Sequence, residues 1–154
     1  MKLLADSMLG SLGRWLRLLG YDTAMAGSEP DWQIVRRARA EGRVILTRDR
    51  ELARRRGVQS LLVLAGDLDA QLDQVAGQLA LPPPQPGTRC LHCNAALLPA
   101  HRDDVAADVP PYVLQTQESF CRCPNCRRVY WRGTHWLNME ARVAAVAAAT
   151  DRSA

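Results

Sequence analysis

Residues 2–20 read Lys2-Leu-Leu-Ala-Asp-Ser-Met-Leu-Gly-Ser-Leu-Gly-Arg-Trp-Leu-Arg-Leu-Leu-Gly20. The first four of these residues form a short, mainly apolar run, which is typical of a buried strand. The leucines that follow recur every three or four residues, the spacing of one helical face, at Leu9, Leu12, Leu16 and Leu19. Gly20 suits the left-handed conformation that ends many helices. This stretch therefore predicts a strand followed by a helix.

The same alternation continues through the first half of the chain. Further strands are predicted at Asp22–Ala26, Arg43–Thr47 and Ser60–Leu64. Further helices are predicted at Trp32–Ala40, Asp49–Arg56 and Asp67–Leu81, the first of them capped by Ser28 and holding Pro30 in its first turn. Strands that alternate with helices are typical of βα units around a parallel sheet. We therefore predict an α/β fold, a parallel sheet flanked by helices.

The composition excludes several classes of protein. The chain has 154 residues, of which 47% are hydrophobic, and its 20 basic and 16 acidic residues leave a net charge of +4. The apolar fraction is sufficient for a packed core, and the mixed charges are unlike those of a disordered chain. No apolar run approaches the ~20 residues that cross a bilayer, and the first residues lack the apolar stretch of a secretion signal. We expect a cytoplasmic protein without a membrane partner.

Aspartates follow the predicted strands. The carboxyl ends of parallel strands meet along one edge of a sheet, where such folds bind their ligands. The candidates at this edge are Asp6, Asp31, Asp49 and Asp67, with Asp69 as a substitute for the last. An aspartate at a helix start also caps backbone N–H groups, so a structural role stays open for each. Converging carboxylates repel one another unless a cation lies among them, so as a set they favour a Mg²⁺ or Mn²⁺ site.

The first half of the chain contains neither histidine nor cysteine. Catalysis by a Ser-His-Asp or Cys-His arrangement is therefore excluded there. The segment Gly10-Ser-Leu-Gly13 matches neither a dinucleotide-binding fingerprint nor a Walker loop. Because a metal-activated water attacks a phosphodiester without any such nucleophile, metal-assisted hydrolysis is the predicted chemistry.

Arginines flank the proposed acidic edge, and guanidinium groups are suited to hold phosphates. We expect this role for Arg14, Arg17, Arg48 and Arg50, with ordinary solvation of a helix face as the alternative. The run Arg54-Arg-Arg56 lies farther along its helix, and we expect it to be solvated surface.

A proline-rich segment, Pro82-Pro-Pro-Gln-Pro-Gly87, precedes all five cysteines. Such a segment supports neither a helix nor a central strand and indicates a stiff connector. Beyond it, two Cys-x-x-Cys pairs are typical of the four-thiolate zinc site of a zinc ribbon: Cys90 with Cys93 and Cys123 with Cys126. An odd cysteine count disfavours a disulfide framework. The spare Cys121 is either a small buried side chain or an alternative ligand.

The predicted organisation has four parts. A first domain over residues 1–81 is followed by a linker over 82–87, a zinc ribbon over 88–137, and a C-terminal helix with a frayed tail over 138–154, of which Asn138–Ala149 is helical. Aromatic residues of the ribbon interleave with arginines, a mixture that can stack bases and contact phosphates. Packing of the small ribbon is the alternative use for its aromatics, which include Tyr130, Trp131 and Trp136.

Three motifs in this order carry a family resemblance: Asp6-Ser-Met-Leu-Gly-Ser-Leu-Gly-Arg-Trp-Leu-Arg-Leu-Leu-Gly-Tyr-Asp22, Arg43-Val-Ile-Leu-Thr-Arg-Asp-Arg50, and the cysteine pairs ending in Val129-Tyr-Trp-Arg-Gly-Thr-His-Trp136. Over this length the chain resembles the Mut-seven C-terminal ribonuclease family. The resemblance implies a PIN-like nuclease fold joined to a zinc ribbon, and a metal-dependent ribonuclease. It implies site roles for Asp6, Asp31 and Asp49, with Asp67 or Asp69 as the fourth acid.

Two functional hypotheses from different classes follow. The first is a metal-dependent endoribonuclease in which three aspartates hold Mg²⁺ or Mn²⁺ and arginines hold the RNA backbone. The second is a non-catalytic module whose zinc ribbon binds RNA or a ribonucleoprotein and whose aspartates are helix caps. RNA is the partner in both, and a protein inhibitor or a ribosome-associated partner is left open.

Overall fold

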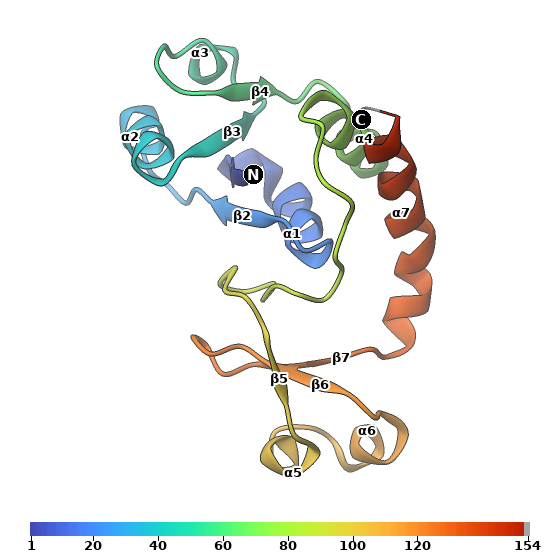
Figure 1. The fold of residues 1–154 in the computed structure, drawn as a ribbon. Helices are drawn as coiled ribbons and strands as arrows, with labels where there is room; N and C mark the ends of the chain where they lie inside the picture. The colour runs from blue at the N-terminus through green and yellow to red at the C-terminus, as the bar shows by residue number, and fades with distance from the viewer. Residues whose placement is uncertain (153–154) are drawn as a thin grey trace.

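The computed structural model describes residues 1–152, except for the side chains of residues 134–138. Its first half is built on a parallel sheet of strand order β2-β1-β3-β4 (Figure 1). The strands are β1 (Lys2–Ala5), β2 (Asp22–Met25), β3 (Arg43–Thr47) and β4 (Ser60–Leu62). The predicted α/β fold with a parallel sheet is confirmed, and β1 and β3 have the predicted bounds.

Two strands end before their predicted last residues. β2 stops at Met25 and β4 stops at Leu62. Val63 still donates to Thr47 O at 2.8 Å, but from Leu64 a side chain replaces the sheet, because the backbone N–H groups of Leu64 and Ala65 donate to Gln74 Oε1 at 3.0 and 3.2 Å.

Helices cover both faces of this sheet. One face carries α1 (Gly10–Leu18), which follows a 3₁₀ turn, η1 (Ser7–Leu9), and α4 (Leu68–Gln78). The other face carries α2 (Asp31–Glu41) and the single-turn α3 (Arg50–Ala53). The leucines predicted to form one face of α1 are all buried in the larger core cluster, as their spacing requires.

The boundaries of three helices differ from those predicted. Ser28 does not cap α2, because the helix begins three residues later and its N-cap is Pro30. α3 covers only part of the predicted Asp49–Arg56. α4 ends three residues before the predicted Leu81. The shortening of α3 has a clear cause, since the Arg39 side chain donates to the carbonyl groups of Arg56 and Gly57 and holds the chain in a turn there.

The proline-rich segment is bonded to the first half of the chain. The backbone N–H of Gln85 donates to Leu19 O at 2.8 Å, and that of Gly87 donates to Leu18 O at 3.0 Å. Gly20 makes this approach possible: its φ is +93°, and a Cβ there would lie 2.2 Å from Gln85 O. The segment is thus a strap across the end of α1.

The second half contains a small antiparallel sheet of order β5-β6-β7, formed by Leu98–Ala100, Phe120–Arg122 and Val129–Trp131. Two short helices, α5 (Arg102–Val105) and α6 (Pro111–Thr116), lie between its first two strands. They enclose a separate cluster around Val105, Val109, Val113 and Phe120. Of these elements the sequence predicts one, a strand over Val129–Arg132 that turns at Gly133, and β7 covers its first three residues.

The C-terminal helix returns to the first half and packs against α4 (Figure 1). α7 spans Thr134–Asp151, so it begins four residues earlier and ends two residues later than predicted. Val146 and Ala149 are buried in the larger core cluster, and Thr150, expected to be frayed, is 3% exposed. The last two residues of the predicted tail, 153 and 154, lie outside the described residues. Among the described residues, no helix is long and apolar enough to cross a bilayer.

Candidate functional site

The carboxyl ends of β1 and β3 bring Asp6 and Asp49 to either side of Thr47. Thr47 is fully buried, and its hydroxyl donates to Asp6 Oδ2 at 2.8 Å. The same hydroxyl accepts a hydrogen bond from the backbone N–H of Asp49 at 2.9 Å. One hydroxyl group therefore fixes the side chain of the first aspartate and the backbone of the second.

Sequence reasoning assigned no role to Thr47. The available signal was a polar residue at the last position of an otherwise apolar strand, directly before the loop that carries Asp49. Such a residue can direct its hydroxyl to the sheet edge, whereas the β-branched methyl group packs in the core.

Asp6 is 9% exposed and lies where β1 leaves the sheet. Its Oδ1 accepts a hydrogen bond from the backbone N–H of Ser7 at 2.6 Å, so it caps η1. With Thr47 on the other oxygen, both carboxylate oxygens have a donor, and the orientation of this side chain is set by the protein.

Asp49 and Asp67 both take up the capping role that sequence reasoning left open. Asp49 Oδ1 accepts hydrogen bonds from the backbone N–H groups of Glu51 and Leu52 at 2.7 and 3.2 Å, at the start of α3. Asp67 Oδ1 accepts one from Ala70 at 2.9 Å, at the start of α4. Both side chains are exposed. Capping leaves one oxygen of each carboxylate for another partner.

Asp31 lies in the first turn of α2, beyond β2, and its carboxylate is 3.7 Å from the Arg55 guanidinium. Asp69, the substitute fourth acid, is paired instead with Arg142 of α7. Among the described residues, only cysteines form a group of three or more metal-ligating side chains around one point. The structure thus brings Asp6 and Asp49 together through Thr47 but does not gather the aspartates into one ligand cluster.

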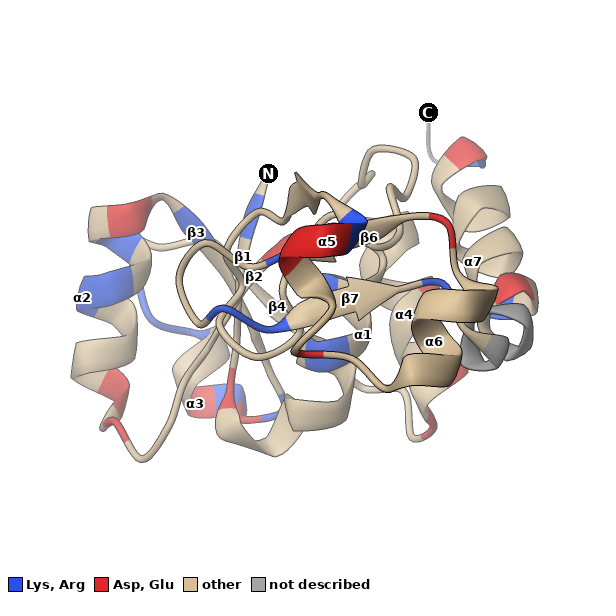
Figure 2. Cartoon of the chain, turned by 90° about the horizontal axis from the view of Figure 1, so that it is seen from below, with Lys and Arg blue, Asp and Glu red and all other residues tan. Residues whose placement is uncertain are grey.

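The four predicted phosphate-binding arginines separate into two kinds. Arg14 on α1 and Arg50 at the start of α3 are exposed, as is Arg48, whose guanidinium also donates to Ala65 O at 2.9 Å. Figure 2 shows basic and acidic residues interspersed on α2 and α3. Arg17 is different: it is 6% exposed and lies away from the acidic edge.

Arg17 is a structural link between the two halves, which corrects its predicted role. Its Nε donates to Thr23 O at 2.8 Å, and its NH1 group donates to the carbonyl oxygens of Leu91 and His92 at 3.0 and 2.9 Å. These two carbonyl groups belong to the loop between Cys90 and Cys93. With three carbonyl partners and little exposure, this guanidinium is not available to a substrate phosphate.

Asn94, directly after the first cysteine pair, also links the halves. Its backbone has a φ of +68°, a conformation that asparagine tolerates better than most residues. Its side chain accepts a hydrogen bond from the backbone N–H of Thr23 at 2.9 Å and donates to Asp22 Oδ1 at 2.7 Å. The cysteine loop therefore covers part of β2, an edge strand of the sheet.

Asp22 receives two hydrogen bonds at this junction, from Asn94 and from Arg43, the latter at 2.7 Å. Burial is the largest single influence on the pKa of Asp22 and raises it. The hydrogen bonds from Arg43 and Asn94 and the charges of Arg43 and Arg89 outweigh burial, so the pKa lies below its usual value. The junction therefore favours the charged carboxylate.

This lowered pKa predicts an acid-sensitive junction. The stabilisation is complete above the ordinary aspartate pKa of about 3.9 and is lost as the pH falls through the lower folded-state value. Asp22→Asn should reduce the free energy of unfolding at about pH 7 by roughly 1–3 kcal/mol and weaken its decline in acid. Denaturant titrations from about pH 7 to below the ordinary aspartate pKa measure the free energy of unfolding of each protein. Asp73→Asn, which changes an exposed aspartate on α4, is the control. An equal acid decline in Asp22→Asn and the parent would contradict it.

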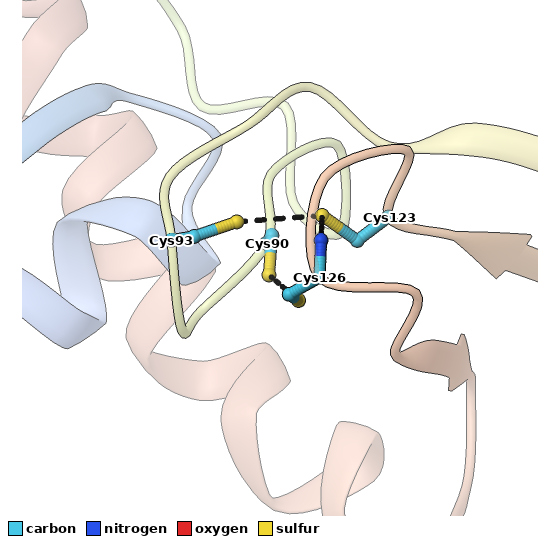
Figure 3. Close-up of side chains that lie close together, drawn as sticks. All are labelled: Cys90, Cys93, Cys123 and Cys126. Atoms are coloured by element: carbon cyan, nitrogen blue, oxygen red, sulfur yellow. Dashed lines mark hydrogen bonds between the residues drawn. The ribbon is translucent and has the colours of Figure 1, made fainter.

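The two cysteine pairs meet in a compact group (Figure 3). The Sγ atoms of Cys90 and Cys126 are 3.5 Å apart, those of Cys93 and Cys123 are 3.4 Å apart, and all four lie within 4.8 Å of one another. Four sulfurs around a zinc ion with 2.3 Å bonds are separated by about 3.8 Å. The group therefore fits a tetrahedral metal ion. Cys121 is not part of it.

The thiols of this group differ in acidity. Burial raises the pKa of Cys123 to about 11. Burial also acts to raise the pKa of Cys93, but hydrogen bonds, first among them one with the Asn125 side chain, outweigh it and lower the pKa to about 6. Thiols this close cannot all ionise together unless a cation neutralises them. The donor set is thus chemically matched to a metal as well as geometrically.

Aromatic residues of β7 serve the ribbon in part as packing. The Tyr130 hydroxyl lies 3.0 Å from Cys90 Sγ, and burial raises the pKa of Tyr130. Trp131 is 36% exposed. The side chain of Trp136 lies outside the described residues.

A family model described as the Mut7-C RNAse domain matches residues 1–143 of the 154-residue chain. The chain belongs to this family. The match to the Mut7-C RNAse domain runs through the parallel sheet, the ribbon and the start of α7, and it confirms the resemblance carried by the three motifs. No curated protein and no solved structure matches the chain significantly. Family membership indicates a ribonuclease-type function with RNA as substrate or partner.

Proposed function

We propose that the protein is a metal-dependent endoribonuclease. The observation that carries the proposal is the Thr47 hydroxyl, which bonds the Asp6 carboxylate and the Asp49 backbone at the edge where parallel sheets bind ligands. Membership of the Mut7-C RNAse domain family supports RNA as the substrate. Asp31 follows β2, the other neighbour of β1, and completes the proposed acidic set.

The residues of this edge suit a hard divalent cation. Asp6, Asp31 and Asp49 offer carboxylate oxygens, the ligands that Mg²⁺ and Mn²⁺ prefer. Such an ion, when bound, activates a water molecule for in-line attack on a phosphodiester. Thr47 keeps the Asp6 carboxylate facing the edge, and the exposed Arg14, Arg48 and Arg50 hold substrate phosphates. Asp67 stays the predicted fourth acid.

Zinc in the four-cysteine group has a structural role in this proposal. Four-thiolate sites are coordinatively closed and stabilise the fold around them. The loop between Cys90 and Cys93 supplies two carbonyl acceptors to Arg17, and Asn94 follows directly. These hydrogen bonds tie the cysteine loop to the edge strand β2, which precedes α2 and Asp31.

A second candidate function rests on the capping roles of the aspartates. Asp6, Asp49 and Asp67 each cap a helix or turn, which is what a non-catalytic RNA-binding module would use them for. Arginines beside Tyr130 and Trp131 would then make the RNA contacts.

The two functions differ in one assay. Labelled single-stranded and structured RNAs are incubated with the protein in Mn²⁺, in Mg²⁺, or without added divalent ion. We expect internal cleavage only when the divalent ion is present, because the attacking water requires it. Binding of the RNA without cleavage in any condition would favour the non-catalytic module.

A further inference from the structure

A basic hollow lies between α2 and the turn after α3, beside the proposed acidic edge. Its volume is about 680 Å³. It is lined by Trp32, Val35, Arg36, Arg39, Ala40, Arg55 and Arg56. Four of these seven lining residues are arginines and none is acidic, so the hollow attracts anions.

Trp32 is 59% exposed, although it is the largest apolar side chain of α2. Ile34, Val35 and Ala38 already bury the inner face of this helix against the sheet. Trp32 and Arg36 are one helical turn apart, so the indole and a guanidinium lie on the same outward face. The indole is therefore not needed for the core and is presented to solvent among positive charges.

The opposite wall of the hollow is held in place by Arg39. Its guanidinium donates to Gly57 O at 2.9 Å and also to Arg56 O. Gly57 has a φ of +75°, and a Cβ there would lie 2.6 Å from the Arg39 guanidinium. This clamp fixes the turn that carries Arg55 and Arg56, which sequence reasoning expected to be ordinary solvated surface.

Acidic residues near α2 are neutralised on another side of the helix. Arg37 pairs with Glu29 and Glu41 at 3.3 and 3.1 Å, and Arg43 also pairs with Glu41. Among the described residues, the only acidic partner of an arginine of the hollow is Asp31, the residue before Trp32, whose carboxylate lies 3.7 Å from the Arg55 guanidinium. The hollow thus keeps its positive charge and adjoins the acidic edge at Asp31.

We propose that this hollow binds an unpaired nucleotide of the RNA, with its base stacked on Trp32 and adjacent phosphates held by Arg36, Arg55 and Arg56. The inference rests on the proposed ribonuclease function and names its substrate class as single-stranded RNA. An exposed indole flanked by guanidinium groups is the combination that binds single strands. A duplex hides its base faces, so it fits less well. Four arginines without an acidic lining residue favour a polyanion over a protein surface of mixed charge.

The test measures binding apart from cleavage. Fluorescence anisotropy gives the affinity of a labelled single-stranded RNA for Asp49→Asn protein and for the same protein carrying Trp32→Ala. We expect about tenfold weaker binding after Trp32→Ala and near-parental binding after Trp32→Phe, because a phenyl ring retains stacking. Arg36→Gln should reduce the slope of log affinity against log salt by about 0.7, the value for one phosphate contact to a single strand.

Two matched variants serve as controls. Tyr112→Ala removes an aromatic residue that is 66% exposed on α6, and Arg102→Gln removes an exposed arginine on α5. Both should bind RNA as the parent does. Equal affinity of Trp32→Ala and the parent, equal binding of the matching duplex, or displacement of the RNA by a polyglutamate peptide at similar concentration would each overturn the proposal.

Failure of this inference is distinguishable from failure of the proposed function. If Trp32→Ala cleaves RNA normally in the presence of the metal and binds it with unchanged affinity, the hollow is not a binding site, whereas the proposed nuclease function still stands. If RNA binding depends on Trp32 but the protein cleaves RNA in no condition, the hollow is supported as a binding site and the proposed nuclease function is wrong.

Discussion

Cys93→Ser is expected to release zinc and unfold the C-terminal half of the chain. Four-thiolate zinc contributes directly to folding, with apparent binding free energies of about 10–16 kcal/mol in zinc-finger peptides. The loss should also spread to β2, because Arg17 and Thr23 are bonded to the cysteine loop and to Asn94. Metal analysis should give about one zinc per parent chain and less in the variant. Hydrogen exchange should show faster exchange in β2 of the variant.

Cys121→Ser is the matched control, because this cysteine lies on β6 outside the four-cysteine group. It should retain the zinc and the parental exchange rate in β2. A stable parent protein that contains no zinc would contradict the assignment of the ribbon. Zinc release without any change in β2 would contradict the coupling between the halves.

Asp49→Asn is expected to abolish cleavage while leaving the fold intact. Asparagine caps a helix as well as aspartate does, so the hydrogen bonds to Glu51 and Leu52 can persist. The amide offers a divalent ion no negative charge. Even partners that only orient a metal ligand typically cost about 10–100-fold when removed, so we expect a loss of at least about a hundredfold. Initial cleavage rates at saturating Mn²⁺ and a thermal melt measure the two properties.

Thr47 supplies the comparison for this experiment. Thr47→Val removes the hydroxyl that joins Asp6 to Asp49, whereas Thr47→Ser keeps it. Thr47 is a positioning residue, so its loss should change the Mn²⁺ concentration needed for half-maximal cleavage. We expect this concentration to rise in Thr47→Val and to stay close to the parental value in Thr47→Ser. If Asp49→Asn cleaves RNA at the parental rate, Asp49 is not part of the catalytic site.

The parallel sheet is readable in the sequence because its strands are buried on both faces. Arg43–Thr47 is a nearly continuous apolar run, and the leucines of α1 keep a strict helical spacing. β5 and β6 carry no such signal. Leu98 and Pro99 are exposed, and Phe120 is buried in a cluster whose valines come from the segment inserted between the two strands. The return of α7 is equally hidden, because an alanine-rich helix does not reveal which face will pack.

The positions of the acidic residues follow from topology, but their contacts do not. Strand order places Asp6 and Asp49 at one edge, whereas the choice between capping and ligation depends on side-chain rotamers. Arg17 shows a second limit. Its acceptors at Leu91 and His92 are more than 70 residues away in the chain, so local pattern gave no sign that its guanidinium would be buried.

The chemical identity of the product ends tests the central claim most directly. A defined single-stranded RNA is cleaved by the parent protein in Mn²⁺, and the new ends are identified by phosphatase treatment, ligation and mass spectrometry. Attack by a metal-activated water with the 3′-oxygen as leaving group, which the resemblance to PIN-like nucleases implies, predicts a 5′-phosphate and a 3′-hydroxyl, with cleavage absent when Asp49→Asn replaces the parent. Products that carry a 2′,3′-cyclic phosphate would show that the 2′-hydroxyl was the nucleophile and would contradict the account.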